Sequence, residues 1–226
     1  MTLGYQRMKW PRVFSIILAL VCANEVSAQN LRVVDGDTLE IEGVSYRLHG
    51  IDAPEHGQKC NKVSGSSWAC GEEATKFLIS LTQGKSVVCE NKGDDIYGRT
   101  IAICETDEIE INSALVAAGL AWAYTKYSDD YLDAEQIAKT AGLGVWQANT
   151  QTPWDFRKTR WQVAEQQAPE GCPIKGNISK SGERIYHTPW SLWYNRTKIS
   201  KNKGERWFCT EAQALKAGWR APFFGG

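Results

Sequence analysis

The stretch VVDGDTLEIEGVSYRLHGIDAPE, residues 33–55, decides the fold of this chain. Apolar and polar residues alternate along residues 38–41 and again along residues 44–48, with a tight turn at Glu42-Gly43 between them. This period of two is typical of a half-buried β-hairpin, because successive side chains of a strand point to opposite faces. A short apolar segment, residues 31–34, precedes the hairpin. The stretch therefore predicts three consecutive strands.

Further elements are predicted after this stretch. Two more strands are expected at residues 86–90 and 100–104, joined by a polar loop from Asn91 to Gly98. Three helices are expected: residues 72–83, a segment from Asn112 as N-cap to Gly119, and a segment from Ser128 as N-cap to Gly142. Five short strands and about three helices indicate an α+β fold and favour a small closed barrel of the OB type. The periodicity alone does not distinguish this barrel from other α+β folds.

The first 28 residues have the pattern of a secretory signal peptide. Basic residues precede an apolar run over residues 13–23, and Val26-Ser27-Ala28 follows it. The run is too short to cross a bilayer, which takes about 20 residues. We therefore expect cleavage after Ala28 and a periplasmic or secreted protein with no stable membrane insertion. A short membrane anchor is the alternative. A lipoprotein attached through Cys22 is disfavoured, because Val21 is a poor residue before a lipidated cysteine.

Composition and charge exclude several classes of protein. Of the 226 residues, 42% are hydrophobic and 23% are charged, so the chain as a whole is not disordered, collagen-like or a coiled coil. Without residues 1–28 it carries 23 basic and 25 acidic residues, which excludes a uniformly basic nucleic-acid coat. Six cysteines remain in the mature chain. An even number in an exported chain favours three disulfides, for which 15 pairings are possible.

The mature chain divides into two units of opposite charge. Residues 29–148 contain the predicted strands and helices and form one domain, and residues 149–168 form a polar connecting segment, helical or extended. Residues 169–226 form a small domain with ten basic and four acidic residues, whereas the rest of the mature chain holds 13 basic and 21 acidic residues. A unit this small is marginal for independent folding, so we expect a Cys172–Cys209 disulfide to stabilise it.

Charged residues at the ends of the predicted strands suit phosphodiester chemistry. Asp37 and Asp52 can bind a hard cation, which prefers oxygen ligands. Arg47 and Arg99 carry planar guanidinium groups that fit phosphate oxygens. Glu55 lies three residues after Asp52, close enough to hold a water molecule beside a cation. A cation, two arginines and a carboxylate are the components that a phosphodiester hydrolase needs.

Each motif also has a simpler explanation when it is taken alone. Asp35-Gly36-Asp37 is more often a turn than a metal site, and Tyr97-Gly98-Arg99 is typical of a hairpin end. His56 adjoins Glu55 and could act as the base of the reaction, but surface-loop histidines are the more common case for both His49 and His56. Only the combination of motifs points to catalysis.

From Val34 to Trp146 the combination resembles the staphylococcal nuclease (thermonuclease) family. The shared segments are VDGDT, YRLHGIDAPE, YGR, NSALVAAGLAWAY and GLGVWQ, in the same order and at compatible spacing. The resemblance implies an OB barrel with helices. It also implies calcium-dependent hydrolysis of DNA and RNA that leaves 3′-phosphates.

The resemblance further assigns roles to single residues. It implies calcium ligands at Asp37, Asp52 and the backbone carbonyl of Ala53, with Asp35 near the metal rather than bound to it. The remaining roles concern the phosphate and the water: Arg47 and Arg99 as phosphate-binding arginines, and Glu55 as the general base.

This chain departs from the staphylococcal enzyme at the nucleotide contacts and in its cysteines. Ile96 replaces a phosphate-contacting lysine, whereas Tyr97 is kept. The nucleotide-stacking tyrosines of the family lie two residues apart, but Tyr124 and Tyr127 lie three apart, so nucleotide binding and core packing are both open for them. The predicted disulfides are Cys60–Cys70, Cys89–Cys104 and Cys172–Cys209.

The second unit, residues 169–226, is similar to a small module that follows the nuclease domain in many bacterial members of the family. It also resembles in part the metal-binding fold of the Ada DNA-repair protein, but the cysteines that bind zinc there are absent. We therefore expect a disulfide and no zinc. The basic residues, with Tyr186, Trp190, Trp193 and Trp207, suit a tether for single-stranded nucleic acid. The alternative is that these rings form the core of a small domain.

The sequence thus predicts a secreted or periplasmic monomer that binds calcium and cuts DNA and RNA without sequence preference. Two other function classes remain open: a non-catalytic nucleic-acid-binding OB module, and an envelope interaction protein whose partner binds the second unit. A binding module has no need of a complete catalytic set, so the presence of five residues favours the nuclease: Asp37, Arg47, Asp52, Glu55 and Arg99.

Overall fold

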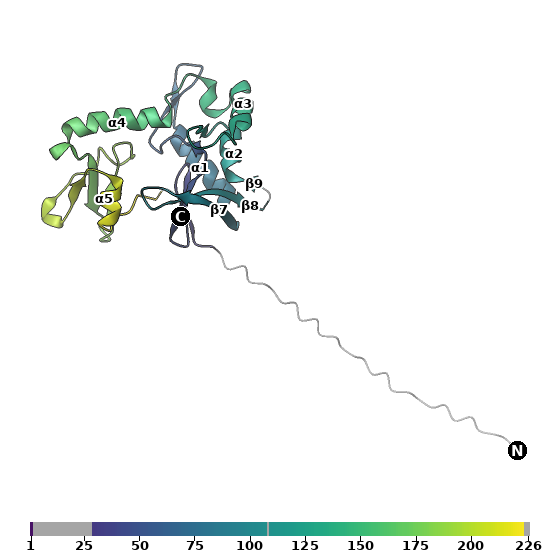
Figure 1. Ribbon diagram of the computed structural model, residues 1–226, viewed down its shortest axis with the longest axis horizontal. Helices are drawn as coiled ribbons and strands as arrows, with labels where there is room; N and C mark the ends of the chain where they lie inside the picture. The colour runs from purple at the N-terminus through teal and green to yellow at the C-terminus, as the bar shows by residue number, and fades with distance from the viewer. Residues whose placement is uncertain (2–28, 108, 224–226) are drawn as a thin grey trace.

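The computed structural model describes Met1, residues 29–107 and residues 109–223. The predicted signal-peptide cleavage site and residues 2–28 lie outside the described residues. Two units lie beside each other, and helix α4 (Pro153–Gln167) runs from the larger unit to the smaller one (Figure 1). Within the described part of the chain, no helix is long and apolar enough to cross a membrane.

The larger unit is built on a sheet that contains all five predicted strands. In spatial order the strands are β1 (Leu31–Asp35), β2 (Thr38–Ile41), β3 (Val44–Leu48), β8 (Thr100–Thr106) and β7 (Val87–Asp94). Neighbouring strands run antiparallel, except that β3 and β8 pair in parallel. The short strand β9 (Ile109–Glu110) also pairs with β8. The predicted α+β class is confirmed.

The two edges of this sheet meet through a side chain. The Nε2 atom of Gln29, just before β1, donates to the carbonyl of Val87 at 3.1 Å, and the backbone N–H of Val87 donates to Gln29 Oε1 at 2.9 Å. In the described residues β1 and β7 do not pair with each other, so the strand pairing is an open path, whereas the sequence predicted a closed barrel. One glutamine amide replaces the ladder that would close it.

Three helices form where the sequence predicted them: α1 (Cys70–Thr82), α2 (Ile111–Ala117) and α3 (Leu132–Thr140). Helices α1 and α2 pack against the sheet, and α3 packs against α2. Leu78 of α1 and Leu115 of α2 are fully buried against Leu39 and Leu48 of the sheet. Each such side chain contributes about 1.5–3 kcal/mol through removal from water. These contacts form the core on which the site is built.

Three local predictions are wrong. Strand β7 continues to Asp94, into the predicted loop. Asn112 is not an N-cap but lies inside α2, where its Nδ2 atom donates to the carbonyls of His49 (3.0 Å) and Ala102 (3.2 Å). Ser128 does not cap α3, which begins after Tyr131. Long-range hydrogen bonds of the kind that Asn112 makes leave no local pattern in the sequence.

Helix α4 occupies most of the predicted connecting segment. Pro153 stands at its first turn, and the hydroxyl of Thr152 accepts a hydrogen bond from the N–H of Asp155 at 3.4 Å, as an N-cap does. The smaller unit that follows has a three-stranded sheet and one helix. Its elements are β12 (Arg184–His187), β11 (Ile174–Ile178) and β13 (Arg206–Phe208) in spatial order, and α5 (Glu211–Lys216).

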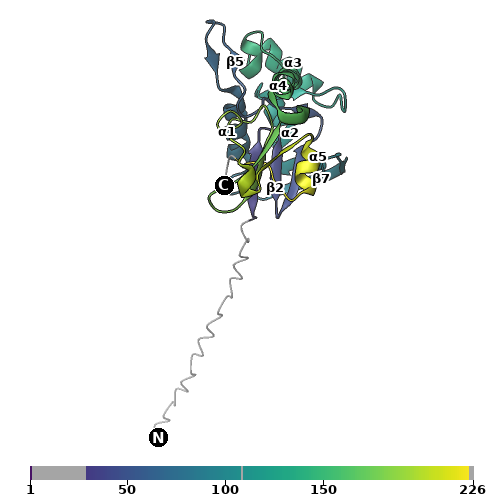
Figure 2. The ribbon, with the colours of Figure 1, turned by 90° about the vertical axis from the view of Figure 1, so that its left-hand side faces the viewer.

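The core of the smaller unit contains one residue that was predicted for nucleic-acid binding. Tyr186 is only 6% exposed and packs with Ile174, Phe208 and Trp219. For Tyr186 the alternative of a core ring is therefore correct. Viewed from this unit (Figure 2), α4 is seen nearly end-on, and the smaller unit lies in front of the sheet of the larger one.

Short elements complete the described chain. They are β4 (Ile51–Asp52) paired with β10 (Trp122–Ala123), β5 (Cys60–Asn61) paired with β6 (Ser67–Trp68), and the 3-10 helices Gly144–Gln147, Pro169–Gly171 and Lys201–Lys203.

Among residues 29–223 the structure has three disulfides, and they are the three predicted pairs: Cys60–Cys70, Cys89–Cys104 and Cys172–Cys209. Cys89 and Cys104 are direct cross-strand partners in β7 and β8. Cys60–Cys70 joins the segment after Glu55 to the first residue of α1. Disulfides persist in oxidising compartments, so these bonds indicate an exported environment.

Candidate functional site

A tight turn between β1 and β2 carries the first carboxylates of the site. The N–H of Asp37 donates to Asp35 Oδ1 at 3.2 Å. A Cβ atom on Gly36 would lie 2.9 Å from the Cβ of Ala53, so glycine allows the turn to pack against the segment after β4. Asp37 is 2% exposed and therefore depends on partners within the protein.

Strand β4 brings Asp52 to the same place. Asp52 lies opposite Trp122 in the β4–β10 pair and is 1% exposed. The next residue, Ala53, donates its backbone N–H to Asp37 Oδ2 at 2.8 Å. This hydrogen bond holds the β1–β2 turn against the end of β4, so the two predicted metal-binding carboxylates lie close together.

Arg47 connects these two carboxylates. It lies on β3 opposite Thr38, and its guanidinium donates to Asp37 Oδ1 and, at 2.8 Å, to Asp52 Oδ1. Burial acts to lower the pKa of Arg47, but Asp37 and Asp52 outweigh burial and raise it. For Asp37 burial has the opposite effect and raises the pKa, and the guanidinium of Arg47 acts against that rise.

A second arginine, Arg157 of α4, enters the site from outside the predicted domain. Its two terminal nitrogens donate to Asp52 Oδ1 and Oδ2 at 3.0 and 2.7 Å, and Nη1 donates to Glu55 Oε1 at 2.8 Å. Burial acts to lower the pKa of Arg157, but its hydrogen bond to Asp52 and the charge of Glu55 raise it.

Sequence reasoning missed Arg157. The N-cap at Thr152 and Pro153 after it are local signs of a helix start, so the helix itself could have been predicted. More than 100 residues separate Arg157 from its partners Asp52 and Glu55, and nothing local indicates that pairing.

Glu55 lies in a loop that packs on the first turn of α1. A Cβ atom on Gly71 would lie 1.7 Å from the carbonyl oxygen of Glu55, so the close approach requires glycine there. Burial raises the pKa of Glu55 to about 7, although Arg157 acts to lower it. A carboxylate with a pKa near neutrality can accept a proton from water.

Arg99 and Tyr97 belong to the β7–β8 hairpin. The Nε atom of Arg99 donates to Asp95 Oδ2 at 2.6 Å, and its guanidinium lies 5.4 Å from the centre of the Tyr97 ring. The structure thus pairs Arg99 within its own hairpin. Arg99 and Tyr97 nevertheless line the cavity that holds Asp52 and Glu55.

This cavity, of about 840 Å³, brings together residues from both units. The smaller unit contributes Trp190 and Glu211, and the rest of the lining includes Asp35, Arg47, Asp52, Glu55, Tyr97, Arg99, Tyr124, Tyr127, Arg157 and Trp161. The Tyr124 ring also packs 5.3 Å from the Trp154 ring and 5.2 Å from the Tyr127 ring. Tyr124 therefore has a packing role as well as a place on the cavity wall, whereas Tyr127 is 63% exposed.

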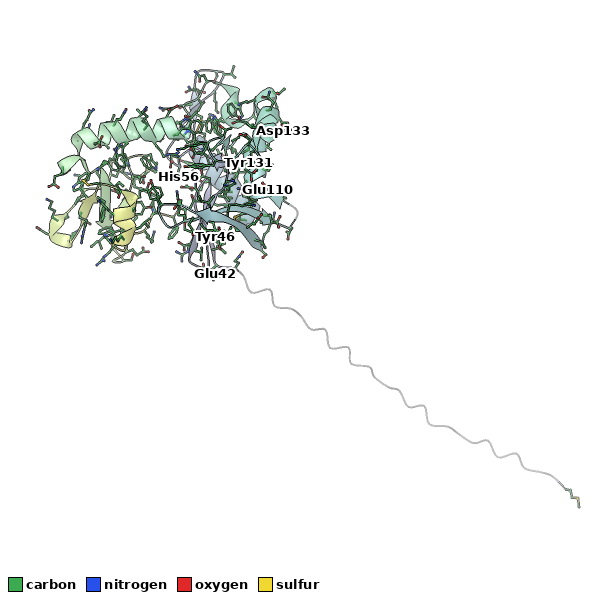
Figure 3. The ribbon with its side chains drawn as sticks, viewed as in Figure 1. Glu42, Tyr46, His56, Glu110, Tyr131 and Asp133 are labelled. Atoms are coloured by element: carbon green, nitrogen blue, oxygen red, sulfur yellow. A yellow bond between two sulfur atoms is a disulfide. The ribbon has the colours of Figure 1, made fainter. Side chains whose placement is uncertain are left out.

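His56 faces the smaller unit (Figure 3). Its Nδ1 atom lies 3.2 Å from the hydroxyl of Thr75, and its ring stacks 6.5 Å from the ring of Trp193. Burial lowers the pKa of His56. These contacts favour a role in packing the units together over the role of a base.

The donor atoms of this site suit a hard cation. They are the carboxylates of Asp37 and Asp52, the nearby Asp35 and the backbone carbonyl of Ala53, all of them oxygen donors. The two carboxylates already bind cationic guanidinium groups. In the residues that the structure covers, no cluster of three or more His, Cys, Asp or Glu is arranged to hold a metal ion. A calcium ion would therefore need carbonyl and water ligands as well.

Known protein families and relatives match large parts of this chain. A family model described as staphylococcal nuclease homologue matches residues 45–148. An uncharacterized endonuclease of Haemophilus influenzae is 34% identical over 145 residues, which cover 61% of this chain and 75% of that protein. The chain belongs to the staphylococcal nuclease homologue family. Membership supports a nuclease function and the OB-type architecture of the larger unit.

Two further relatives are named as a nuclease and as a biosynthesis protein. A micrococcal nuclease of Shigella flexneri is 30% identical over 161 residues, which cover 63% of this chain and 87% of that protein. The succinoglycan biosynthesis protein ExoI of Rhizobium meliloti is 33% identical over 144 residues, 59% of this chain and 74% of that protein. A second family model, described as ArfC, matches residues 160–221. Arg157 lies between the two matched regions of this nuclease-family chain.

Proposed function

We propose that this protein is a calcium-dependent nuclease that hydrolyses phosphodiester bonds of DNA and RNA without sequence preference and leaves 3′-phosphates. The observation that carries the proposal is the contact of Arg47 with both Asp37 and Asp52, with Arg47, Asp52 and Glu55 on the wall of one cavity. Family membership supports the nuclease chemistry.

In this proposal Asp37, Asp52 and the carbonyl of Ala53 hold the calcium ion, with Asp35 close by. The bound ion would lower the pKa of water and neutralise charge on the phosphate. No zinc is expected, because the six cysteines of the described chain are all in disulfides.

The protein's own groups supply the remaining chemistry. Glu55, with a pKa of about 7, accepts a proton from the attacking water. Arg47 and Arg99 donate hydrogen bonds to the phosphate and stabilise the charge that grows on its oxygens. The bond between phosphorus and O5′ breaks, O5′ takes up a proton from solvent water, and the phosphate stays on O3′. Tyr97, Tyr124 and Tyr127 contact the nucleotide.

The chain organisation fits an exported enzyme. We assign residues 1–28 to a signal peptide, 29–148 to the nuclease domain, 149–168 to a connecting segment and 169–226 to the second domain. Three disulfides support a periplasmic or secreted location. We further propose that the mature protein is a monomer.

The test uses the mature protein with single-stranded DNA, RNA and plasmid DNA, each with calcium, with magnesium and with a chelator. We expect cutting with calcium and none with the chelator. A 3′-phosphate blocks extension by a polymerase, so the products should be extended only after phosphatase treatment. Binding of DNA without cutting in any of these conditions would contradict the proposal and favour a non-catalytic OB module.

A further inference from the structure

One face of α4 lies along the proposed site. Trp154, Arg157 and Trp161 follow each other at spacings of three and four residues, which places them on one side of the helix. Trp154 packs 5.3 Å from Tyr124, and Arg157 binds Asp52. Trp161 lies one turn beyond Arg157, lines the same cavity and also packs against the core of the smaller unit.

Trp161 forms an aromatic pair with Trp190. The two ring centres are 6.2 Å apart, and their planes are inclined by 38°. Both residues are half-buried, and both line the cavity that contains Asp52 and Glu55. Trp190 follows β12, so the pair brings a ring of the second unit to the nuclease site. Neither tryptophan lies within residues 45–148, the part that matches the nuclease family.

The other aromatic residues considered for nucleic-acid binding lie elsewhere. Tyr186 is in the core of the second unit. Trp193 packs on His56, and the ring of Trp207 lies 5.5 Å from Nζ of Lys175. None of these three rings lines the large cavity. The position of the Trp161–Trp190 pair beside Asp52 and Glu55 therefore sets it apart from them.

Basic side chains lie on the same cavity wall as the pair. Arg157 and Lys158 come from α4, and Lys92 and Arg99 come from the β7–β8 hairpin. Aromatic rings combined with basic side chains hold single strands without sequence preference, because every base has a face that can stack. In a duplex, neighbouring base pairs cover these faces, so a ring on a cavity wall can stack only on an unpaired base.

We propose that Trp161 and Trp190 form a stacking subsite for an unpaired base next to the phosphate that is cut. This inference rests on the proposed nuclease function and adds the substrate class, namely single-stranded DNA or RNA, or an unpaired segment of a duplex. The second unit then forms part of the substrate cleft instead of acting as a separate tether.

The test compares the binding of single strands after removal of a tryptophan ring from the protein, of the bases from the DNA, or of both. The probes are a fluorescein-labelled single-stranded DNA and the same strand with abasic sites in place of its bases, both bound in chelator so that neither is cut. Trp161→Leu and Trp190→Leu remove the stacking face and keep apolar bulk. Wild type should bind the base-containing strand more than about tenfold more tightly than the abasic strand, and in each variant this ratio should fall several-fold, with the remainder due to Tyr97, Tyr124 and Tyr127.

Trp207→Leu is the matched control, because its ring belongs to the same unit but lies outside the cavity. It should keep the wild-type ratio. A labelled duplex should bind wild type and Trp161→Leu equally. An unchanged ratio in both variants, or an equal fall in Trp207→Leu, would overturn the subsite. Thermal unfolding identifies which variants remain folded, and either variant of the pair suffices for the comparison.

Cleavage of the same single strand with calcium separates this inference from the function on which it rests. Cutting by wild type with an unchanged base-to-abasic ratio in the variants overturns the subsite alone. A lowered ratio without any cutting by wild type supports the subsite and overturns the nuclease function.

Discussion

Two arginines share the carboxylate of Asp52. Oδ1 accepts hydrogen bonds from both Arg47 and Arg157, and Oδ2 accepts one from Arg157. Both lone pairs of Oδ1 are therefore used. Two like unit charges about 4 Å apart repel by about 4 kcal/mol at the effective dielectric constant of a protein. A divalent cation bound by Asp52 would thus compete with Arg157 for that carboxylate.

Removal of Arg157 should strengthen calcium binding. We expect Arg157→Gln to bind calcium about tenfold more tightly than wild type, because one of the two guanidinium groups at Asp52 is removed and only Arg47 remains there. Calorimetric titration of calcium, without substrate, measures this directly. Arg160→Gln is the matched control, since Arg160 is exposed on the same helix and the charge change is the same. Weaker binding by Arg157→Gln would mean that Arg157 orders the carboxylates instead of competing for them.

His187 should make the protein less stable in acid. Its Nε2 atom lies 2.8 Å from Asn177 Oδ1, and burial, together with Lys175, lowers its pKa to about 4. The unfolded chain, with a histidine pKa of about 6.5, binds a proton where the folded protein does not. The free energy of unfolding should therefore fall as the pH falls, by about 3 kcal/mol between pH 7 and pH 4.

The measurement is urea denaturation across this pH range for wild type and His187→Gln, whose amide can keep the hydrogen bond to Asn177. The difference in the free energy of unfolding between wild type and His187→Gln should change by about 3 kcal/mol from pH 7 to pH 4, because wild type loses stability more steeply as the pH falls. A difference that is constant with pH would show that His187 does not titrate in this way.

At the scale of elements, close packing of backbone segments positions Glu55, the proposed general base. The Glu55 loop lies directly on the first turn of α1, where Gly71 has no side chain. The Cys60–Cys70 disulfide joins the same loop to the same helix one residue earlier. The position of Glu55 is therefore set by the α1 terminus as well as by β4.

Gly71→Ala should destabilise the protein and reduce activity. Its Cβ atom would lie 1.7 Å from the Glu55 carbonyl oxygen, so either the loop or the helix end must move. Overpacking of this kind costs about 1–3 kcal/mol. Denaturation measures the free energy of unfolding, and the rate of DNA cleavage reports whether Glu55 keeps its position. Gly84→Ala adds the same atom where nothing lies within 4 Å, although its positive φ adds backbone strain. Cleavage by Gly71→Ala at the wild-type rate would contradict the account.

Much of the larger unit could be predicted from local patterns. Alternating residues predicted the β2–β3 hairpin, and the Asp-Gly-Asp turn predicted where Asp37 would lie. Contacts between distant segments could not be predicted in this way. The pairing of Arg157 with Asp52, the bond between Gln29 and Val87, and the side-chain bonds of Asn112 each join segments that no sequence period relates.

At the scale of the whole molecule, two units with different charge form one cavity. The larger unit supplies Asp52 and Glu55, and Trp190 and Glu211 come from the smaller unit. The smaller unit has a core of few residues, so we expect its shape to depend on the Cys172–Cys209 disulfide. We therefore expect activity on nucleic acid to depend on the fold of both units.

Loss of the Cys172–Cys209 disulfide should loosen the smaller unit. The two cysteines are 37 residues apart, and a crosslink over such a loop contributes about 4 kcal/mol. A double variant, Cys172→Ser with Cys209→Ser, should unfold at lower temperature and be cut by protease within residues 169–223, with weaker binding of single strands. A variant that resists protease and binds like wild type would show that the core alone is sufficient.

The central claim is that Glu55, placed beside Asp52 and Arg47, belongs to a working nuclease site. The most direct measurement is the single-turnover cleavage rate of single-stranded DNA with calcium by wild type, by Glu55→Gln and by Glu73→Gln, an exposed control on α1. The account predicts a loss of about 10²–10⁴-fold in Glu55→Gln, with DNA binding retained, and an unchanged rate in the control. Cleavage by Glu55→Gln at the wild-type rate would contradict it.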